Sequence, residues 1–304
     1  MAFEIPQLYT EMFNLNIRTV AQQNKSRLAE TVTSESQSTE VEYIDEIQPI
    51  ELVRKTARNA STPLDPAIYY RRASFLQDWH RGVPVKDPSD TIRMSMRDPT
   101  WAVTGQLASA RNRCRDTNII RIALGTVQRR DEERESFDQI DIPASNRVAV
   151  NYVSSGTPVN SNLTIAKLIK MRSILGLSED DALATGAPEI YFVHSQRQID
   201  SLLLYAEQVS NNLYAEVRAL MDGKIHYFMG FKFVQTELLP VVNGIRTCMA
   251  YTKDTILEKV GMNDFSRVDI REDKSYITQA YTMVSYGGVR RQEKTIVTCQ
   301  CDEN

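Results

Sequence analysis

The sequence predicts an α+β fold, because its helices and strands fall in separate runs rather than in regular β–α–β alternation. One long helix is expected from about Asp98 to Gly125, with Val103, Leu107 and Ala110 on its apolar face. Two shorter helices are expected after Asn162 and Ser195, and strands with period-two alternation fill most of the chain beyond residue 226.

The long helix has clear signals at both ends. Asp98 suits the N-cap, Pro99 suits the first helical position, and Gly125 stops the pattern. At about 26 residues this helix spans about 39 Å, which is typical of a structural spine. The third helix begins with a capping box, Ser195 followed by Gln198 at the third position.

The strands are recognised by alternation and by their stops. In HYFMGFKFVQTELLP, residues 226–240, Phe231 and Phe233 alternate with Lys232 and Val234. Residues 39–44 resemble an edge strand. Residues 268–273, 276–286 and 293–301 are expected to be closing strands, joined in part by a Gly287-Gly288 hairpin turn.

Composition indicates an ordinary globular chain with uneven charge. Of the 304 residues, 42% are hydrophobic and 25% charged, and the net charge is −3. Residues 1–50 are acidic and residues 51–150 are basic. The asymmetry reflects either solvated faces or an acidic arm that lies on a basic region of a neighbouring copy, where arginine forks suit buried carboxylate pairs.

The first hundred residues contain two segments that cannot form a core alone. Residues 1–60 are rich in Ser, Thr, Gln and Glu, so they are either disordered or ordered by contact with something else. Residues 61–97 contain four prolines and two strand-like stretches, Ile68–Phe75 and Thr91–Met96. We expect a long twisted hairpin with a polar tip, and long loops of this kind are usually interactive.

The motifs that carry chemistry are missing from the sequence. Its three histidines, His80, His194 and His226, lie far apart, and no Cys/His spacing matches a metal site. No phosphate-binding loop, dinucleotide fingerprint or nucleophile elbow occurs. Cys299 and Cys301 share one face of a strand, which fits a structural role better than a metal or redox pair. We expect no cofactor and no enzymatic activity.

The sequence also indicates the kind of cellular compartment in which the protein is made. The four cysteines are too scattered for a disulfide framework, so a reducing compartment is expected. No apolar run reaches the roughly 20 residues that span a bilayer, and residues 1–13 do not resemble a signal peptide. We therefore expect no membrane contact.

Nucleic-acid binding is weakly indicated. The long helix carries Arg111, Arg113, Arg115 and Arg121, but they face several directions and Asp116 interrupts them. A recognition helix gathers its basic residues on one face, so intersubunit pairing is the better interpretation.

The order of elements resembles the major capsid proteins of tailed bacteriophages with the Hong Kong 97-type fold, over about residues 22–301. RLAETVTSESQSTEVEYIDEI resembles the family's N-terminal arm, and DPTWAVTGQLASARNRCRDTNIIRIALG its spine helix, with Arg113 and Asp116 matching a recurrent Arg-x-x-Asp. EIYFVHSQRQIDSLL and GKIHYFMGFKFVQTELLP are similar to the axial domain. The stretch from Val268 to Cys301 resembles the closing strands of the peripheral domain.

The resemblance implies a domain plan. It consists of an N-terminal arm (1–60), an extended hairpin (61–97), a peripheral domain with the spine helix (98–161), an axial domain (162–262) and the closing strands of the peripheral domain (263–304). The implied function is a virion shell protein that self-assembles into pentamers and hexamers around double-stranded DNA, in the host cytoplasm. The alternatives are an encapsulin-like shell protein of a cellular compartment, an enzyme with an unrecognised site, and a nucleic-acid-binding module.

The resemblance also implies partners and contacts. A separate scaffolding protein and a portal are expected, with non-specific contact to packaged DNA and room for a decoration protein. Lys86 lies in the expected hairpin, but no motif supports covalent cross-linking through it. The residues expected to contact other subunits are Glu40, Glu42, Asp45, Tyr69, Tyr70, Phe75, Trp79, Arg111 and Arg115.

Overall fold

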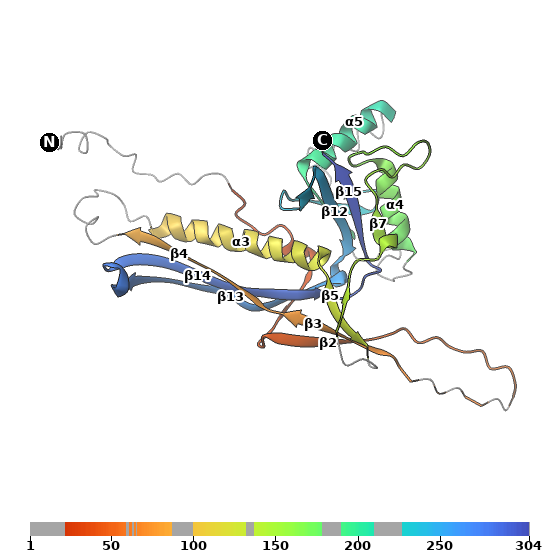
Figure 1. The fold of residues 1–304 in the computed structure, drawn as a ribbon, viewed down its shortest axis with the longest axis horizontal. Coiled ribbons are helices and arrows are strands. Elements are labelled where there is room, and N and C mark those ends of the chain that lie inside the picture. The colour runs from red at the N-terminus through yellow and green to blue at the C-terminus, as the bar shows by residue number, and fades with distance from the viewer. Residues whose placement is uncertain are drawn as a thin grey trace. The chain divides into compact units, whose positions relative to one another are not determined.

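A computed structural model describes residues 22–58, 61–62, 64, 66–86, 100–131, 137–177, 190–209 and 227–303. It has the mixed α+β architecture that the sequence predicts (Figure 1). The helices within these residues are α3 (Thr100–Leu124), α4 (Ile165–Gly176) and α5 (Gln196–Val209), with short 3₁₀ turns between other elements. None of these helices is long and apolar enough to cross a membrane.

A seven-stranded sheet holds most of the core. Its order is β7-β15-β12-β8-β10-β9, and the short β11 pairs with β12. All five residues of β8 are buried, as expected for a strand with neighbours on both edges and both faces covered. The strands are β7 (Arg147–Val148), β8 (Ile190–His194), β9 (Tyr227–Phe228), β10 (Phe231–Gln235), β11 (Val241–Val242), β12 (Ile245–Thr252) and β15 (Ile296–Asp302).

The last strand corrects one expectation. β15 was predicted to close the peripheral domain, but it lies between β7 and β12 in the seven-stranded sheet. The reason is visible in its residues, since Ile296, Val297, Cys299 and Cys301 are all fully buried. A strand with apolar side chains on both faces needs a central position.

Two helices of this sheet region begin at side-chain caps. The Thr164 hydroxyl accepts a hydrogen bond from the Lys167 backbone N–H, so α4 begins at Ile165 rather than at Asn162. The capping box of α5 is present: the Ser195 backbone N–H donates to Gln198 Oε1 at 2.9 Å. Lys167 is fully buried, and its Nζ donates to the carbonyl oxygens of Val150, Ser161 and Gln300 at 2.6–3.0 Å.

A second sheet has the order β2-β3-β5-β6. Its hairpin differs from the predicted one, because β3 pairs antiparallel with β2 on one edge and β5 on the other. Residues 91–96, its expected partner, lie outside the described residues, as do Asp98 and Pro99. The strands are β2 (Val41–Ile47), β3 (Tyr69–Phe75), β5 (Val127–Asp131) and β6 (Asp138–Ile140).

The connection between β2 and β3 is long. The Gln48 N–H donates to the Ile68 carbonyl at 3.0 Å, which extends the ladder by one step. The chain then leaves the paired strands in a wide excursion (Figure 1). We call β2, β3 and the described residues between them the hairpin. The hairpin defined in this way includes residues 41–58, which were expected to belong to the N-terminal arm.

The third sheet has the order β1-β13-β14-β4, with β1 (Thr33–Ser36), β4 (Gln77–Lys86), β13 (Ile256–Arg271) and β14 (Ile277–Arg290). The Gly287-Gly288 pair lies inside β14 and is not the predicted hairpin turn. Gly288 has a φ of +142°, and a Cβ there would lie 2.5 Å from the Leu257 carbonyl oxygen and 2.6 Å from Ile122 Cδ1. Glycine is needed here for close approach of two strands and a helix.

The structure divides into two compact units. Among the described residues, the first contains 22–26, 78–86, 100–114 and 262–285, and the second contains the rest. In the first unit the arm follows α3 through side-chain contacts. Arg113 donates to Gln22 Oε1 at 2.7 Å, Asn112 to the Asn24 carbonyl at 2.7 Å, and Ser109 to Asn24 Oδ1 at 3.0 Å.

In the second unit, the next turn of α3 also binds the arm. The fully buried Asp116 carboxylate accepts the backbone N–H groups of Arg27 and Leu28 at 3.0 and 3.2 Å. The recurrent Arg-x-x-Asp of the family therefore binds the arm of its own chain. Residues 22–37 are thus ordered by contact with the rest of their own chain, where Leu28 and Val32 join the core.

Two glycine-to-alanine changes test this packing. Gly288→Ala is expected to lower the free energy of unfolding by about 3 kcal/mol, because it combines a positive φ with close contacts to backbone. Gly105→Ala, in open space on α3, is expected to raise it by about 0.5–1 kcal/mol. Urea denaturation of the unassembled protein measures both, and equal midpoints for the two variants would contradict the close approach at Gly288.

Candidate functional site

Enzymatic chemistry has no evident centre in the described part of the chain. No group of three or more His, Cys, Asp and Glu side chains is arranged to hold a metal ion there. His194 is buried with its ring against Phe192 and Phe233, and His226 lies outside the described residues. No disulfide joins any of the four cysteines, and Cys299 and Cys301 share a face with their Sγ atoms 3.9 Å apart, as predicted.

The hairpin exposes an unusual amount of apolar surface. Leu52 and Leu64 are 99% and 92% exposed. Single exposed apolar residues are ordinary, but a series on one extended element marks a contact surface. The exposed apolar residues of the hairpin are Tyr43, Ile47, Ile50, Leu52, Val53, Leu64, Ile68, Tyr69 and Phe75.

The open face of the β2-β3-β5-β6 sheet combines these aromatic rings with arginines. The Tyr43 and Phe137 rings stack with centroids 5.7 Å apart. The Arg71 guanidinium lies 5.6 Å from the Tyr43 centroid, and that of Arg130 lies 6.0 Å from Phe137. Asp45 completes the face through a 2.6 Å ion pair with Arg71.

The opposite face of this sheet carries a buried ion network. Arg72 bonds both carboxylate oxygens of Glu293, at 2.5 and 2.9 Å, and Glu46 at 3.2 Å. Burial disfavours the Arg72 charge, but Glu293 and Glu46 outweigh it and raise its pKa above the usual value. Burial likewise opposes the Glu293 charge, yet Arg72 and Arg290 leave the pKa of that carboxyl lowered.

A second arginine of this network ends α3. Arg290 is fully buried and donates to the carbonyl oxygens of Ala123 and Gly125, at 3.0 and 2.9 Å, and of Ile140 at 3.2 Å. A cation at a helix C-terminus satisfies the last carbonyls and complements the helix dipole. Burial lowers the pKa of Arg290 from its usual value.

The predicted acidic contacts have partners within the chain. Glu42 and Glu35 both bind Lys259 Nζ at 2.8 Å. Burial opposes the charge on Lys259, but these two carboxylates outweigh it and raise its pKa. Asp45 pairs with Arg71, as described above, while Glu40 is exposed.

The predicted aromatic contact residues differ in how far they are exposed. Tyr69 and Phe75 are 44% and 41% exposed. Tyr70 is half-buried beneath Arg129, with the guanidinium 4.4 Å from its ring centroid, and Trp79 is also half-buried.

Arg111 and Arg115, the two predicted contact residues on α3, are also half-buried. Arg115 binds Glu258 through two bonds, at 2.8 and 2.6 Å, and this hydrogen bonding raises its pKa. The structure therefore does not gather the nine predicted residues into one site. Their contacts with other subunits stay a prediction.

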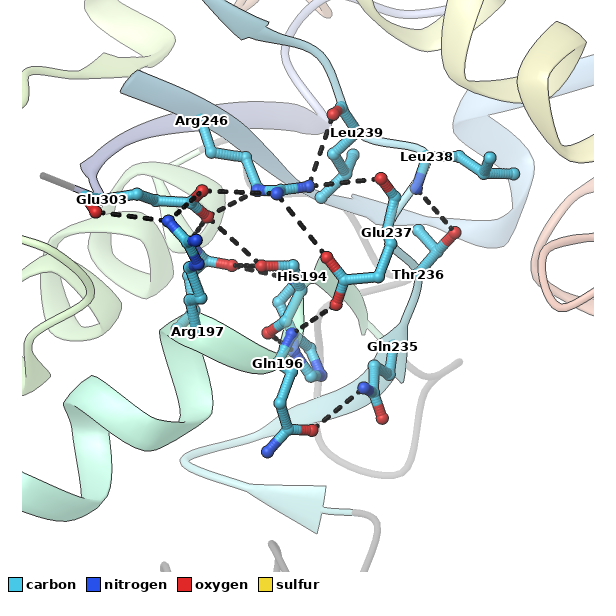
Figure 2. Close-up of polar contacts among 12 residues, drawn as sticks. His194, Gln196, Arg197, Gln235, Thr236, Glu237, Leu238, Leu239, Arg246 and Glu303 are labelled. Carbon is cyan, nitrogen blue, oxygen red and sulfur yellow. Dashed lines mark hydrogen bonds and ion pairs between the residues drawn. The ribbon is translucent and has the colours of Figure 1, made fainter. Parts of the chain in front are cut away.

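A polar cluster surrounds the start of α5 (Figure 2). Glu303 accepts from Arg246 Nε at 2.5 Å and from Gln198 Nε2 at 2.8 Å. Arg246 also donates to the carbonyl oxygens of Glu237 and Leu239. Burial opposes the Glu303 charge, but Arg246 and Gln198 keep the pKa of this carboxyl below its usual value.

Sequence reasoning missed both ion networks. Arg72, Glu293 and Arg290 are separated by up to 221 positions along the chain, and no local pattern marks them as partners. Arg246 lies on β12 and Glu303 directly follows β15, and these two segments were predicted to belong to different domains. One usable signal was Arg290 itself, since a charged residue at the end of a buried strand needs a partner.

The described residues define a class of protein before any comparison. They expose an apolar hairpin whose base is held by buried ion pairs, which is typical of a structural protein that assembles with other chains. The sequence matches a family model described as phage capsid protein over residues 5–303, and the chain belongs to this family. It is thus a structural component of the virion capsid.

Solved structures agree with this assignment. The capsid of Ralstonia phage GP4 matches with a TM-score of 0.69 at 9% identity, covering 100% of this chain and 98% of that chain. The Cyanophage Pam1 capsid asymmetric unit matches with a TM-score of 0.68 at 12% identity, covering 99% of both chains. Mycobacterium phage Che8 matches with a TM-score of 0.62 at 13% identity, covering 95% of this chain and 96% of that chain.

These likenesses establish the fold, and the predicted resemblance to Hong Kong 97-type capsid proteins is confirmed. Among curated proteins, none matches this chain.

Adjacent arginines on β3 test the buried network. Arg72→Ala is expected to lower the free energy of unfolding by about 3 kcal/mol, because it leaves Glu293 in a mostly buried position without its main partner. Arg71→Ala removes an exposed pair with Asp45 and is expected to cost about 0–1 kcal/mol. Chemical denaturation of both variants measures the difference, and equal losses would show that burial does not distinguish the two pairs.

The pH dependence of stability tests His194. Burial lowers its pKa from 6.5 to about 4. Between these values the unfolded chain binds more protons than the folded chain, so stability falls as pH is lowered. This effect is expected to remove about 2 kcal/mol between about pH 7 and pH 5.

The matching variant is His194→Gln, which removes the titration. Its unfolding free energy at neutral pH is expected to be lower than that of the natural chain, but to change less over the same pH range. The range stays above the ordinary pKa of glutamate, so the lowered carboxyls of Glu293 and Glu303 do not contribute. Parallel pH curves for the two proteins would rule out the buried neutral imidazole.

Proposed function

We propose that this chain is the major capsid protein of a tailed bacteriophage and builds an icosahedral shell around the double-stranded DNA genome. The observation that carries the proposal is the uncovered hairpin of a chain in the phage capsid protein family. Pentamers and hexamers are the building blocks that the Hong Kong 97-type fold implies. A cellular compartment shell is the weaker alternative, because the matching family is a phage family.

The domain plan follows from the sheets. The seven-stranded sheet with α4 and α5 would form the axial domain, including β15. The β1-β13-β14-β4 sheet with α3 would form the peripheral domain. A scaffolding protein, a portal, a decoration protein and non-specific contact with DNA complete the proposal, supported by the family resemblance alone.

The hairpin is the part we propose to reach a neighbouring copy. Its described tip carries three basic residues and one acidic residue, namely Arg54, Lys55, Arg58 and Glu51. The same stretch of sequence contains the exposed apolar residues Ile50, Leu52 and Val53. An apolar segment rimmed by basic side chains fits an apolar surface with acidic neighbours. The exposed Glu30, Glu35 and Glu40 of the arm offer such carboxylates on another copy.

Electron microscopy tests the proposed function directly. The purified protein, co-expressed with a scaffolding protein from the same phage, is expected to form closed shells or tubes in negative stain and to sediment as large particles. Only compact monomers under these conditions would contradict the proposal. Cargo-filled shells without any scaffold would favour the compartment alternative.

A hairpin variant tests which element makes the contact. The double change Leu52→Ser and Leu64→Ser removes two side chains with almost no contacts in their own chain, so unfolding free energy is expected to change by less than about 0.5 kcal/mol per site. The yield of shells is expected to fall at least tenfold, since buried interface anchors contribute about 1–3 kcal/mol each. Sedimentation velocity measures the yield.

The matched control is Leu177→Ser, which removes a 79% exposed leucine at the end of α4. It is expected to assemble like the natural chain. Normal shells from the hairpin variant would show that the exposed leucines are not an assembly contact.

A further inference from the structure

The short hairpin formed by β11 and β12 ends in an exposed apolar turn. Val241 and Val242 are 45% and 66% exposed. Among the described strands, β11 pairs with β12 alone, so its other edge is uncovered there. An uncovered edge strand with exposed valines is a liability that monomers usually avoid.

This turn is held rigidly rather than left mobile. Val242 pairs with Ile245, and the two residues between them, Asn243 and Gly244, have φ values of 52° and 77°. Positive φ at both central positions defines the tight turn that matches the twist of the flanking strands. The backbone of such a turn has little freedom to fold its valines back against the body.

A buried ion pair between Arg246 and Glu303 lies next to this turn in the chain (Figure 2). Arg246 is clamped to Glu303 and bonds the carbonyl oxygens of Glu237 and Leu239, just before β11. The Glu303 N–H donates to the Gly244 carbonyl at 2.9 Å. Both ends of the turn are therefore fixed, and a surface fixed in advance loses less entropy on binding.

The arrangement of the two valines indicates the geometry of the contact. Consecutive residues of a strand point to opposite faces, so Val241 and Val242 present apolar surface on both sides of the hairpin. A copy in a closed ring has two neighbours and meets them through two different surfaces. One valine on each face provides one contact for each neighbour.

Charges beside the hairpin add to the complementarity. Glu237 precedes β11, lies 3.5 Å from Arg246, and has a side chain that is 55% exposed. Arg197 pairs with Glu303 at 3.6 Å and is 65% exposed, so both side chains also face solvent. Repeating copies around a ring can bring the arginine of one copy to the glutamate of the next, with the valines between them.

We infer that the Val241–Ile245 turn is a ring contact between copies of this chain, with Arg197 of one copy facing Glu237 of the next. This inference rests on the proposed shell function and names the surface that would close its rings. It is separate from the hairpin between β2 and β3, which lies on another sheet.

The first experiment replaces both valines. Val241→Ser with Val242→Ser is expected to keep the circular dichroism and thermal unfolding of the natural chain but to lower shell yield at least tenfold. Leu204→Ser, a 62% exposed position on α5, is the matched control and is expected to assemble normally. Normal assembly of the valine variant overturns the inference but leaves the proposed function intact, whereas failure of the natural chain to form shells overturns the proposed function.

A second experiment keeps the turn unchanged, so it remains decisive if the valine variant fails to fold. Protein with Arg197→Lys is prepared in ¹⁴N and ¹⁵N forms, mixed, assembled and treated with a carbodiimide, which joins a lysine amine to a carboxylate with loss of water. Peptides that link position 197 of one isotope to Glu237 of the other are expected by mass spectrometry. Links only within one isotope overturn the inference.

Discussion

The carboxylate of Glu293 is the contact on which the second unit depends. It binds Arg72 of β3 through both oxygens and lies 3.8 Å from Nε of Arg290. Arg290 in turn holds the last carbonyls of α3. One acidic side chain therefore connects the base of the hairpin, the end of the long helix and the strand that leads to β15.

A body fixed in this way can carry surfaces that have no cover of their own. The arm is bonded along α3, the hairpin base is held by buried charge, and the β11–β12 turn rests on Arg246 and Glu303. The hairpin and the β11–β12 turn both carry exposed apolar residues, among them Leu52 and Val242. The polar interactions thus fix position, while the apolar side chains remain available for neighbours.

Local features could be predicted from the sequence, but pairings between strands and side chains far apart in the chain could not. The α3 helix, the Ser195–Gln198 capping box and the alternation in β10 depend on neighbouring residues. The partner of β3 could not be chosen, because residues 41–47 and 91–96 both resemble strands.

Two further errors have the same physical origin. Gly287-Gly288 was interpreted as a turn, although Gly288 lies inside a strand against Leu257 and Ile122, which come close to it only in the folded chain. β15 was predicted among the closing strands of the peripheral domain, because its pairing partners β7 and β12 lie far from it in the sequence. The candidate contact residues had a similar limit, since Glu42 and Arg115 found partners in their own chain.

The exposed leucines of the hairpin also bear on how errors in a growing shell are corrected. Burying one such side chain fully is worth about 1.5–3 kcal/mol, which is too little for a single contact to hold two copies together for long. A copy added in the wrong orientation engages few of these contacts and dissociates quickly, because differences in affinity appear mainly in the off-rate. A correctly placed copy engages its hairpin and receives that of a neighbour, so many small contacts add to a lasting one. Strengthening the apolar contacts of the hairpin would therefore be expected to speed the growth of shells but to raise the fraction of malformed particles.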